Sequence, residues 1–245
     1  MKNILNVARR VITQLKGDPR FLSLTLIAPT IVVYFLKLFM DTMPDGFPVA
    51  RYAIPIVSFV VFFLSFLLCS IVLVQERMVG TLDRCFVNGV RKVEIIAGYV
   101  LGYTILSCLV SAIVLAQSVY LFELEYNLHQ LFLLFIIMCM LSIISVLFGI
   151  FASTFARTEG HIFPIIPIVI LPSVFLTGLL MDADLLPRVA QWIGRFSPLY
   201  YSNNLIYEVI RPDGTLVGVY ENIWYLLGFG IILLFVSSWI LRDVD

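Results

Sequence analysis

The sequence predicts an all-α, polytopic membrane protein with six transmembrane helices. Of its 245 residues, 61% are hydrophobic and only 13% are charged, which lies well outside the averages of soluble domains. The apolar residues gather in six charge-poor runs, and a helix needs about 20 such residues to cross about 30 Å of hydrocarbon. The predicted spans are residues 21–40, 52–74, 95–122, 130–156, 162–181 and 222–241. We expect residues 1–245 to form a single transmembrane domain.

The N-terminal segment, residues 1–20, is expected to be an amphipathic helix on the membrane surface. Over residues 2–16, the apolar side chains fall on one arc of a helix and the polar side chains fall on the other. The polar face carries four basic side chains, which suit anionic lipid headgroups. No small-residue cleavage site follows the next apolar run, so the segment does not resemble a signal peptide.

Two features stand out within the first four spans. Lys37 is the only charged residue inside any predicted span, and we expect its side chain to reach the nearby interface rather than to line a pathway. The third span carries Gly98 and Gly102, a pair of small residues four positions apart. Such a pair lets helices approach closely, either within one chain or between two copies of it.

The fifth predicted span contains Pro164, Pro167 and Pro172. Each proline removes a backbone donor and disturbs the helix, so we expect a kinked span. A passive kink and a gating role remain alternatives.

Residues 182–210, which separate the fifth span from the last, are predicted to be helical rather than an open loop. Apolar residues recur with helical spacing over 186–196, and Ser197-Pro198 interrupts the pattern. Tyr200, Tyr201 and Tyr207 follow, and aromatic residues of this kind gather at membrane interfaces.

Residues 75–94 form a charged hairpin between the second and third spans. These spans are charge-free over 23 and 28 residues, respectively, so the hairpin must lie in water. If the N-terminus is cytoplasmic, eleven Lys and Arg residues fall on the inner side and four or five on the outer side. The positive-inside rule therefore places the hairpin and both termini in the cytoplasm.

The hairpin resembles the first cytoplasmic loop of ABC transporter permeases of the type-2 exporter class. The matching residues are Glu76-Arg77-x-x-Gly80-Thr81-Leu82-Asp83-Arg84, followed by Arg91-Lys92-x-Glu94-x-x-x-Gly98. Met78 replaces the second Glu of the family motif, and Val87-Asn88-Gly89 replaces a proline-containing turn. A second resemblance lies in 182–210, where Leu186, Pro187, Gln191, Pro198, Leu199 and Tyr201 match a family signature in order.

This resemblance implies a fold, partners and sites. The segment 182–210 should form short helices that enter the outer leaflet, and the hairpin should include a coupling helix that docks on a separate ATPase subunit. Two permease copies, expected as a homodimer in the cell membrane, should bind two ATPase subunits that hold ATP and Mg²⁺. This chain itself should hold no cofactor. The expected ATPase-coupling residues are Glu76, Arg77, Gly80, Thr81, Leu82, Asp83 and Arg84.

The same resemblance places the second and fifth spans around a substrate cavity. An aromatic stripe at helical spacing, Phe59, Phe62, Phe63 and Phe66, lies in the second span. A cavity lined by this stripe would suit a hydrophobic or amphipathic drug, peptide or lipid. A stripe that packs against neighbouring helices or faces lipid is an equal alternative.

Catalytic motifs are missing from the sequence. It contains no Walker A motif, no H-E-x-x-H and no G-x-S-x-G, which argues against an enzyme. The cysteines, Cys69, Cys85, Cys108 and Cys139, show no C-x-x-C spacing, so neither a disulfide framework nor a metal site is predicted. The zero net charge argues against nucleic-acid binding. The alternative to a permease is a non-transporting membrane anchor or an assembly factor for a complex.

Overall fold

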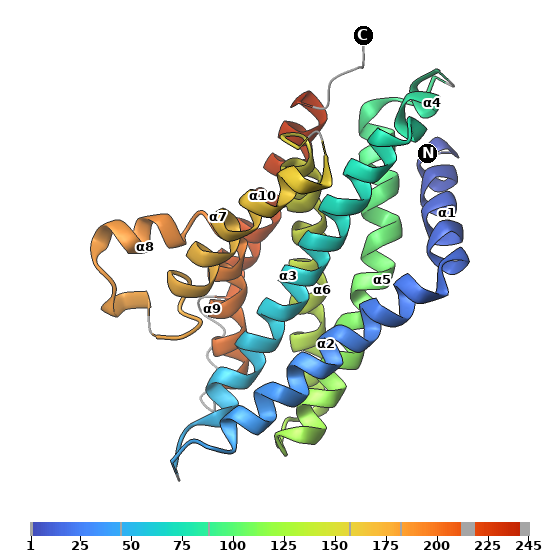
Figure 1. Cartoon of the computed structure of the whole chain (residues 1–245). Helices are drawn as coiled ribbons and strands as arrows, with labels where there is room; N and C mark the ends of the chain where they lie inside the picture. Colours follow the sequence, from blue (N-terminus) through green and yellow to red (C-terminus); the bar gives the residue numbers. More distant parts are fainter. Residues whose placement is uncertain are drawn as a thin grey trace.

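The computed structural model describes residues 2–44, 46–87, 89–156, 158–181, 183–211 and 219–240. The side chains of Lys2, Asp83, Phe86 and Val219 lie outside this description, as do Arg157 and residues 241–245. The helices form an elongated bundle (Figure 1). In chain order they are α1 (Lys2–Gly17), α2 (Pro19–Met40), α3 (Val49–Met78), α4 (Thr81–Val87), α5 (Lys92–Leu121), α6 (Leu128–Ser153), η1 (Glu159–His161), α7 (Ile162–Phe175), η2 (Ala183–Leu185), α8 (Arg188–Gly194), α9 (Pro198–Ile210) and α10 (Val219–Ile240).

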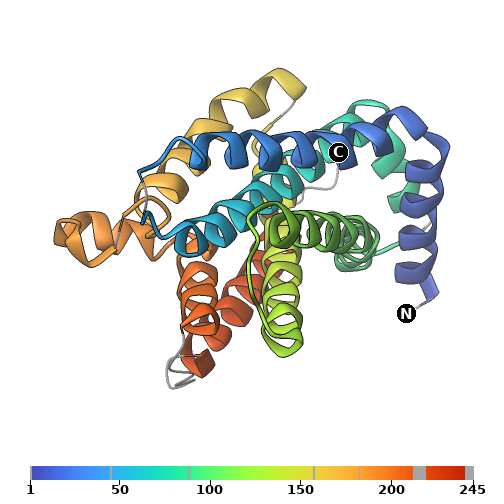
Figure 2. The ribbon, with the colours of Figure 1, turned by 90° about the horizontal axis from the view of Figure 1, so that it is seen from below.

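The break between α1 and α2 follows from local chemistry. Asp18 accepts a 3.0 Å hydrogen bond from the backbone N–H of Phe21, and Pro19 occupies the first helical position of α2. A capping carboxylate followed by proline is a favourable helix start. The chain therefore turns sharply, and α1 runs at a marked angle to α2 (Figure 2).

The predicted amphipathic helix is present, but its apolar face is covered by protein. Val7 and Val11 of α1 are buried against Gly98 and Gly102 of α5. A Cβ atom built on Gly98 would lie 2.5 Å from the Cβ of Val7. The small-residue pair of the third span thus serves packing within one chain. Much of the apolar arc of α1 contacts α5 instead of the membrane surface that we expected.

The centre of the bundle is formed by α3, α5 and α6, whose buried apolar side chains make one continuous core. Buried serines tie these helices together. Ser65 donates a 2.9 Å hydrogen bond to Ser107, and the hydroxyls of Ser111 and Ser142 lie 3.3 Å apart. Small hydroxyl residues allow close helix approach and satisfy each other in an apolar medium.

Five described helices are long and apolar enough to cross a membrane, namely α2, α3, α5, α6 and α10. The fifth predicted span, over 162–181, is not confirmed as a continuous helix. α7 has 14 residues, about 21 Å at 1.5 Å per residue, and ends at Phe175. Pro167 and Pro172 lie inside it and remove backbone donors. Beyond it, Gly178 takes a φ of +82°, a conformation that ends regular helix.

The length of the bundle is instead covered by α7 and α9 together. α7 begins beside Val74 near the α4 end, where Ile162 packs on Val74 and Ala156. α9 ends at the opposite end of the bundle, where the carbonyl of Val209 accepts a 3.1 Å hydrogen bond from Gln130. The predicted break at Ser197-Pro198 is confirmed, because α9 starts at Pro198. α8 projects sideways between them (Figure 1).

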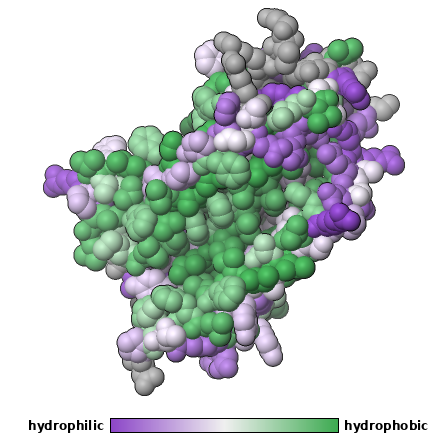
Figure 3. All heavy atoms as spheres, in the orientation of Figure 1, coloured by the Kyte–Doolittle hydropathy of each residue, from purple (hydrophilic) through white to green (hydrophobic). Residues whose placement is uncertain are grey.

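The surface is divided by polarity along the bundle axis. Hydrophobic residues cover the face formed by α2, α7 and α8 (Figure 3). Hydrophilic residues gather at the end that holds α1 and α4, and again at the opposite end (Figure 3). The last described residues of α10 lie at the α4 end, which we call the inner end (Figure 1). The chain is a multi-pass membrane protein by this pattern and by its spanning helices.

Candidate functional site: an inner hairpin and a lateral cavity

The inner hairpin is built from the end of α3, helix α4 and the start of α5. α3 continues past the predicted span to Met78. Gly80 follows with a φ of +72°, and Gly89 after α4 has a φ of +74°. Glycine adopts this left-handed region without steric cost, so both glycines are suited to reverse the chain. They set α4 across the inner end of the bundle.

Glu76 is the centre of a buried polar network rather than a surface residue. Only 4% of it is exposed. Its Oε2 accepts 2.5 Å hydrogen bonds from Arg10 of α1 and from the hydroxyl of Tyr99 of α5. Arg10 also donates a 3.3 Å hydrogen bond to the sulfur of Cys85 in α4. One carboxylate therefore joins α1, α3 and α5, and Arg10 extends the network to α4.

Arg10 keeps its charge although it is partly buried. Although burial disfavours a charged guanidinium, the neighbouring Tyr99 and Glu76 hold the pKa of Arg10 above its ordinary value. A paired buried carboxylate is far less costly than an isolated one. The network thus holds α1, α3, α4 and α5 together. Its geometry depends on α1 staying packed against α5.

A second contact holds α1 to the start of α5. The side-chain amide of Asn3 donates a 3.0 Å hydrogen bond to Glu94, which also accepts one from the backbone N–H of Arg91. These two bonds, the Asn3 bond first, lower the pKa of the Glu94 carboxyl. Glu94 therefore fixes both the beginning of α5 and the N-terminal end of α1.

Arg77 and Leu82, two of the predicted coupling residues, also have structural partners. Arg77 donates hydrogen bonds of 3.0 and 3.2 Å to the carbonyls of Ser153 and Ala156, at the end of α6, where helix carbonyls lack partners of their own. Leu82 is only 2% exposed and belongs to the main core. Leu82, which we expected among the ATPase-coupling residues, is thus not accessible on the hairpin surface, because α4 turns it towards the bundle.

The hairpin nevertheless offers a mixed surface. Met78 and Val79 are exposed at the α3 end of the turn, and Val87 at the end of α4 is 88% exposed. Arg84 is exposed between them, and Gly80 and Thr81 are half-buried. The side chain of Asp83 lies outside the described part. Exposed apolar residues beside a charge are typical of a protein-binding surface.

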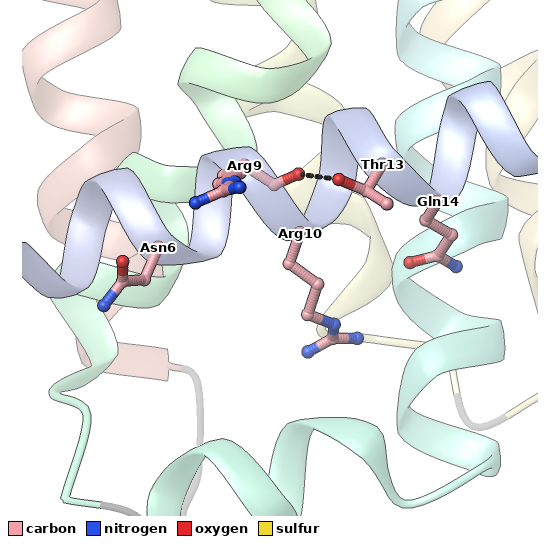
Figure 4. Close-up of a pocket in the computed structure, with 5 residues that line it drawn as sticks. All are labelled: Asn6, Arg9, Arg10, Thr13 and Gln14. Carbon is pink, nitrogen blue, oxygen red and sulfur yellow. Dashed lines mark hydrogen bonds between the residues drawn. The ribbon is translucent and has the colours of Figure 1, made fainter.

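Beside the hairpin, the polar face of α1 borders an open hollow. Its volume is about 490 Å³, and it is lined by Asn6, Arg9, Arg10, Thr13 and Gln14. Figure 4 shows Arg10 pointing away from α1 across this hollow, while the hydroxyl of Thr13 bonds back to the carbonyl of Arg9. The hollow therefore presents cationic and neutral polar groups at the inner end.

A second, largely apolar cavity of about 460 Å³ lies at the side of the bundle. It is bounded by α3, α6, α7, the end of α8 and the start of α9. The residues that line it are Phe62, Phe148, Phe151, Ala152, Phe155, Ile165, Ile168, Val169, Pro172, Ser173, Ile193, Phe196, Ser197 and Pro198. The cavity therefore lies alongside α7, between this helix, the α3–α6 pair and residues 193–198.

The aromatic stripe of α3 is divided between the core and this cavity. Phe62 is fully buried and lines the cavity. Phe66 is also buried, with its ring 5.9 Å from that of Phe148. Phe59 and Phe63 are half-buried and stack on each other at 6.3 Å. Of the four, only Phe62 lies on the cavity wall.

Several residues of both sites were not predicted from the sequence. Arg10 and Tyr99 complete the Glu76 network, but an arginine on a polar helix face and a tyrosine in an apolar span carry no pairing signal. Phe148, Phe151 and Phe155 line the cavity from the α6 side. Their spacing places them on one helix face, so this stripe could have been found in the same way as that of α3.

In the part of the chain that the structure describes, no three His, Cys, Asp or Glu residues gather as a metal site.

Comparisons with known proteins agree with this architecture. The sequence model of the ABC-2 type transporter family matches residues 2–210. The chain is 25% identical over 181 residues to ABC transporter G family member 20 of Dictyostelium discoideum, covering 72% of this chain and 24% of that protein. It is 23% identical over 158 residues to the probable multidrug ABC transporter permease YbhR of Escherichia coli (strain K12), covering 64% of this chain and 43% of that protein. The chain thus matches less than half the length of either relative. Because the family model covers α1 to α9, this protein belongs to the ABC-2 type transporter family.

Proposed function

We propose that the chain is the membrane-spanning permease subunit of an ATP-binding cassette exporter. It moves a hydrophobic or amphipathic substrate, such as a drug, a peptide or a lipid, out of the cytoplasm. ATP is hydrolysed on a separate ATPase subunit, two copies of which act on a permease homodimer. Both termini and the hairpin are cytoplasmic in the cell membrane. Family membership and the eleven basic residues of the inner segments support this assignment.

The observation that carries the proposal is the structure of the hairpin. One side of it is bonded to the helix bundle, and the other side is exposed. Arg10 ties α4 and α1 to Glu76 of α3, while Val87, Met78 and Val79 remain exposed. A partner that moves α4 therefore also exerts force on α1, α3 and α5 through these hydrogen bonds. This is the mechanical requirement for coupling, because a ligand shifts an equilibrium only through contacts that differ between the two states.

The hairpin contacts proposed here revise the predicted set. Gly80 and Thr81 shape the turn, and Arg84 and Val87 reach the ATPase. The ATPase is not contacted by Glu76, Arg77 or Leu82. These residues support the interface by holding α4 against the bundle. Asp83 stays within the proposed interface by its position in the sequence. Phe59, Phe62, Phe63 and Phe66 remain the proposed substrate-pathway stripe, with Phe62 at the cavity wall.

Co-purification from native membranes tests the proposal. The tagged full-length chain should retain a protein that carries a Walker A motif, in equal numbers of copies. Val87→Asp should reduce recovery of this ATPase, since it places a charge at an apolar contact. Leu128→Asp is the matched control, because Leu128 is 84% exposed at the opposite end. If no Walker A protein is retained, or if both variants retain it equally, the permease assignment is wrong and a passive membrane anchor is favoured.

A further inference from the structure

The lateral cavity contains two hydroxyl groups in an otherwise apolar wall. We propose that it binds an uncharged, mostly apolar molecule that carries one hydroxyl donor, and that Ser197 accepts the hydrogen bond from that donor. The proposal rests on the proposed function, since it narrows the substrate to neutral long-chain alcohols and molecules of similar chemistry. The site lies within one chain, at the place where α7 gives way to α9.

The wall of the cavity favours an apolar body. Three phenylalanines of α3 and α6 line it, with Phe155 just beyond α6 and with Ile165 and Val169 of α7. A volume of about 460 Å³ falls within the range of roughly 300–1,000 Å³ of small-molecule sites. Aromatic and aliphatic walls of this size suit a chain or ring system that would otherwise lie among lipid tails.

The polar end of the cavity is defined by Ser173 and Ser197, whose hydroxyl oxygens lie 3.0 Å apart. Both residues are more than nine-tenths buried. Ser173 donates its only proton to the carbonyl of Val169 at 2.8 Å. Because a serine has one donor and two acceptor positions, Ser197 must be the donor within the pair. The oxygen of Ser197 then retains acceptor capacity, and a ligand must bring the proton.

Pro172 of α7 leaves one backbone carbonyl without its usual donor. Because Pro172 has no backbone N–H, the carbonyl of Ile168 cannot receive the usual helical hydrogen bond from residue 172. Ile168 and Pro172 both line the cavity. In an apolar medium, an acceptor without its helical donor favours ligands that provide one, which adds to the preference that Ser197 sets.

Charge is disfavoured in this cavity. Among the described residues that line it, none is acidic or basic. A charged headgroup placed there would lose its hydration without gaining a counter-ion, which is far more costly than burial of a hydroxyl. A neutral alcohol thus fits better than an ammonium or carboxylate of the same length.

The exposed apolar residues at the edge of the cavity would let a ligand enter from the bilayer. Phe155, Ile168 and Phe196 line the cavity and are each exposed. Ile168 lies on α7, Phe155 follows α6 and Phe196 follows α8. Figure 3 shows a hydrophobic surface over the face formed by α2, α7 and α8. A molecule dissolved in lipid can therefore reach the cavity without crossing water.

Photolabelling of the full-length chain in phosphatidylcholine nanodiscs tests the proposal. The probes are hexadecanol carrying a chain diazirine, its methyl ether and its trimethylammonium analogue. We expect hexadecanol to label α6 and α7 and to exceed the ether roughly 3- to 10-fold, the worth of one hydrogen bond. The ammonium probe should label these helices least. Ser197→Ala should abolish the preference for alcohol over ether, whereas Ser142→Ala, in a buried serine pair away from the cavity, should keep it.

A second pair of variants distinguishes labelling inside the cavity from labelling by probe dissolved in the surrounding lipid. Ile165→Trp fills the cavity and should reduce labelling by all probes, while Ile136→Trp, on the exposed face of α6, should not. Equal labelling by alcohol and ether in the wild type, or a preference that survives Ser197→Ala, would overturn the proposal. So would labelling that Ile165→Trp leaves unchanged. Because ATPase co-purification is scored separately, a failed ligand site with a retained ATPase refutes only the ligand, and the reverse refutes only the permease assignment.

Discussion

The guanidinium of Arg10 donates a 2.5 Å hydrogen bond to the carboxylate of Glu76, although the two residues are 66 positions apart. Arg10 belongs to the N-terminal helix and Glu76 to the last turns of α3. This ion pair makes α1 part of the hairpin assembly instead of an independent surface helix. The consequences can be measured one contact at a time.

Removing the cation of this pair should destabilise the protein. Arg10→Gln leaves Glu76 buried beside Tyr99 without its charge partner. We expect a loss of about 1–3 kcal/mol, below the value for a fully buried pair because the Arg10 side chain is 34% exposed. Thermal unfolding in detergent measures it, with Arg9→Gln on the exposed face as the control. The double variant Arg10→Gln/Glu76→Gln should lose less than the sum of its single variants, and strict additivity would contradict the ion pair.

Two apolar residues of α4 should behave in opposite ways. Leu82→Ala empties a buried position and should destabilise the chain by about 2–5 kcal/mol. Val87→Ala removes an exposed side chain, so it should leave the melting temperature unchanged and weaken ATPase retention. Melting temperature and ATPase co-purification, measured on both variants, give this comparison. A stable Leu82→Ala protein that loses the ATPase would show that Leu82 is a contact residue after all.

The close approach of α1 to α5 depends on glycine. Gly98→Ala would place a Cβ atom 2.5 Å from Val7, so α1 must move and the Arg10–Glu76 pair must stretch. We expect a lower melting temperature and faster proteolysis within α1. Gly228→Ala in α10 is the control, because nothing lies within 4 Å of a Cβ atom there. Equal behaviour of the two variants would mean that α1 does not pack on α5.

The Asn3–Glu94 contact should make the position of α1 sensitive to acid. Since the folded state lowers the pKa of Glu94, its contribution is present above the unfolded-state pKa and is lost as the pH falls through the folded-state pKa. Proteolysis of α1 should therefore increase on the acid side of the ordinary carboxyl range. Asn3→Ala should raise proteolysis at neutral pH and flatten this pH dependence. A wild-type pH profile in Asn3→Ala would show that the amide does not act through Glu94.

Much of the fold follows from periodicity in the sequence, since charge-free runs set five of the spans to within a few residues. The charged hairpin and the break at Pro198 were also predictable, because charges and prolines act locally. Three features were not. Prolines indicated a disturbed α7, but not that the residues beyond it, Thr177 and Gly178, accept hydrogen bonds from Asn203 and Tyr207 of α9. The burial of Leu82 depends on how α4 packs on the bundle, and the partner of Glu76 lies on a distant helix. These contacts join residues far apart in the sequence, which local pattern does not encode.

The central claim, that the hairpin docks on an ATPase, is tested most directly by site-specific photocrosslinking. A photoreactive amino acid at Val87 of the full-length chain should capture a protein with a Walker A motif in native membranes, identified by mass spectrometry. The same residue placed at Leu128, at the opposite end of the bundle, should not capture it. If Val87 captures no Walker A protein, or if both positions capture it equally, the hairpin is only a turn between two spans and the coupling account is wrong.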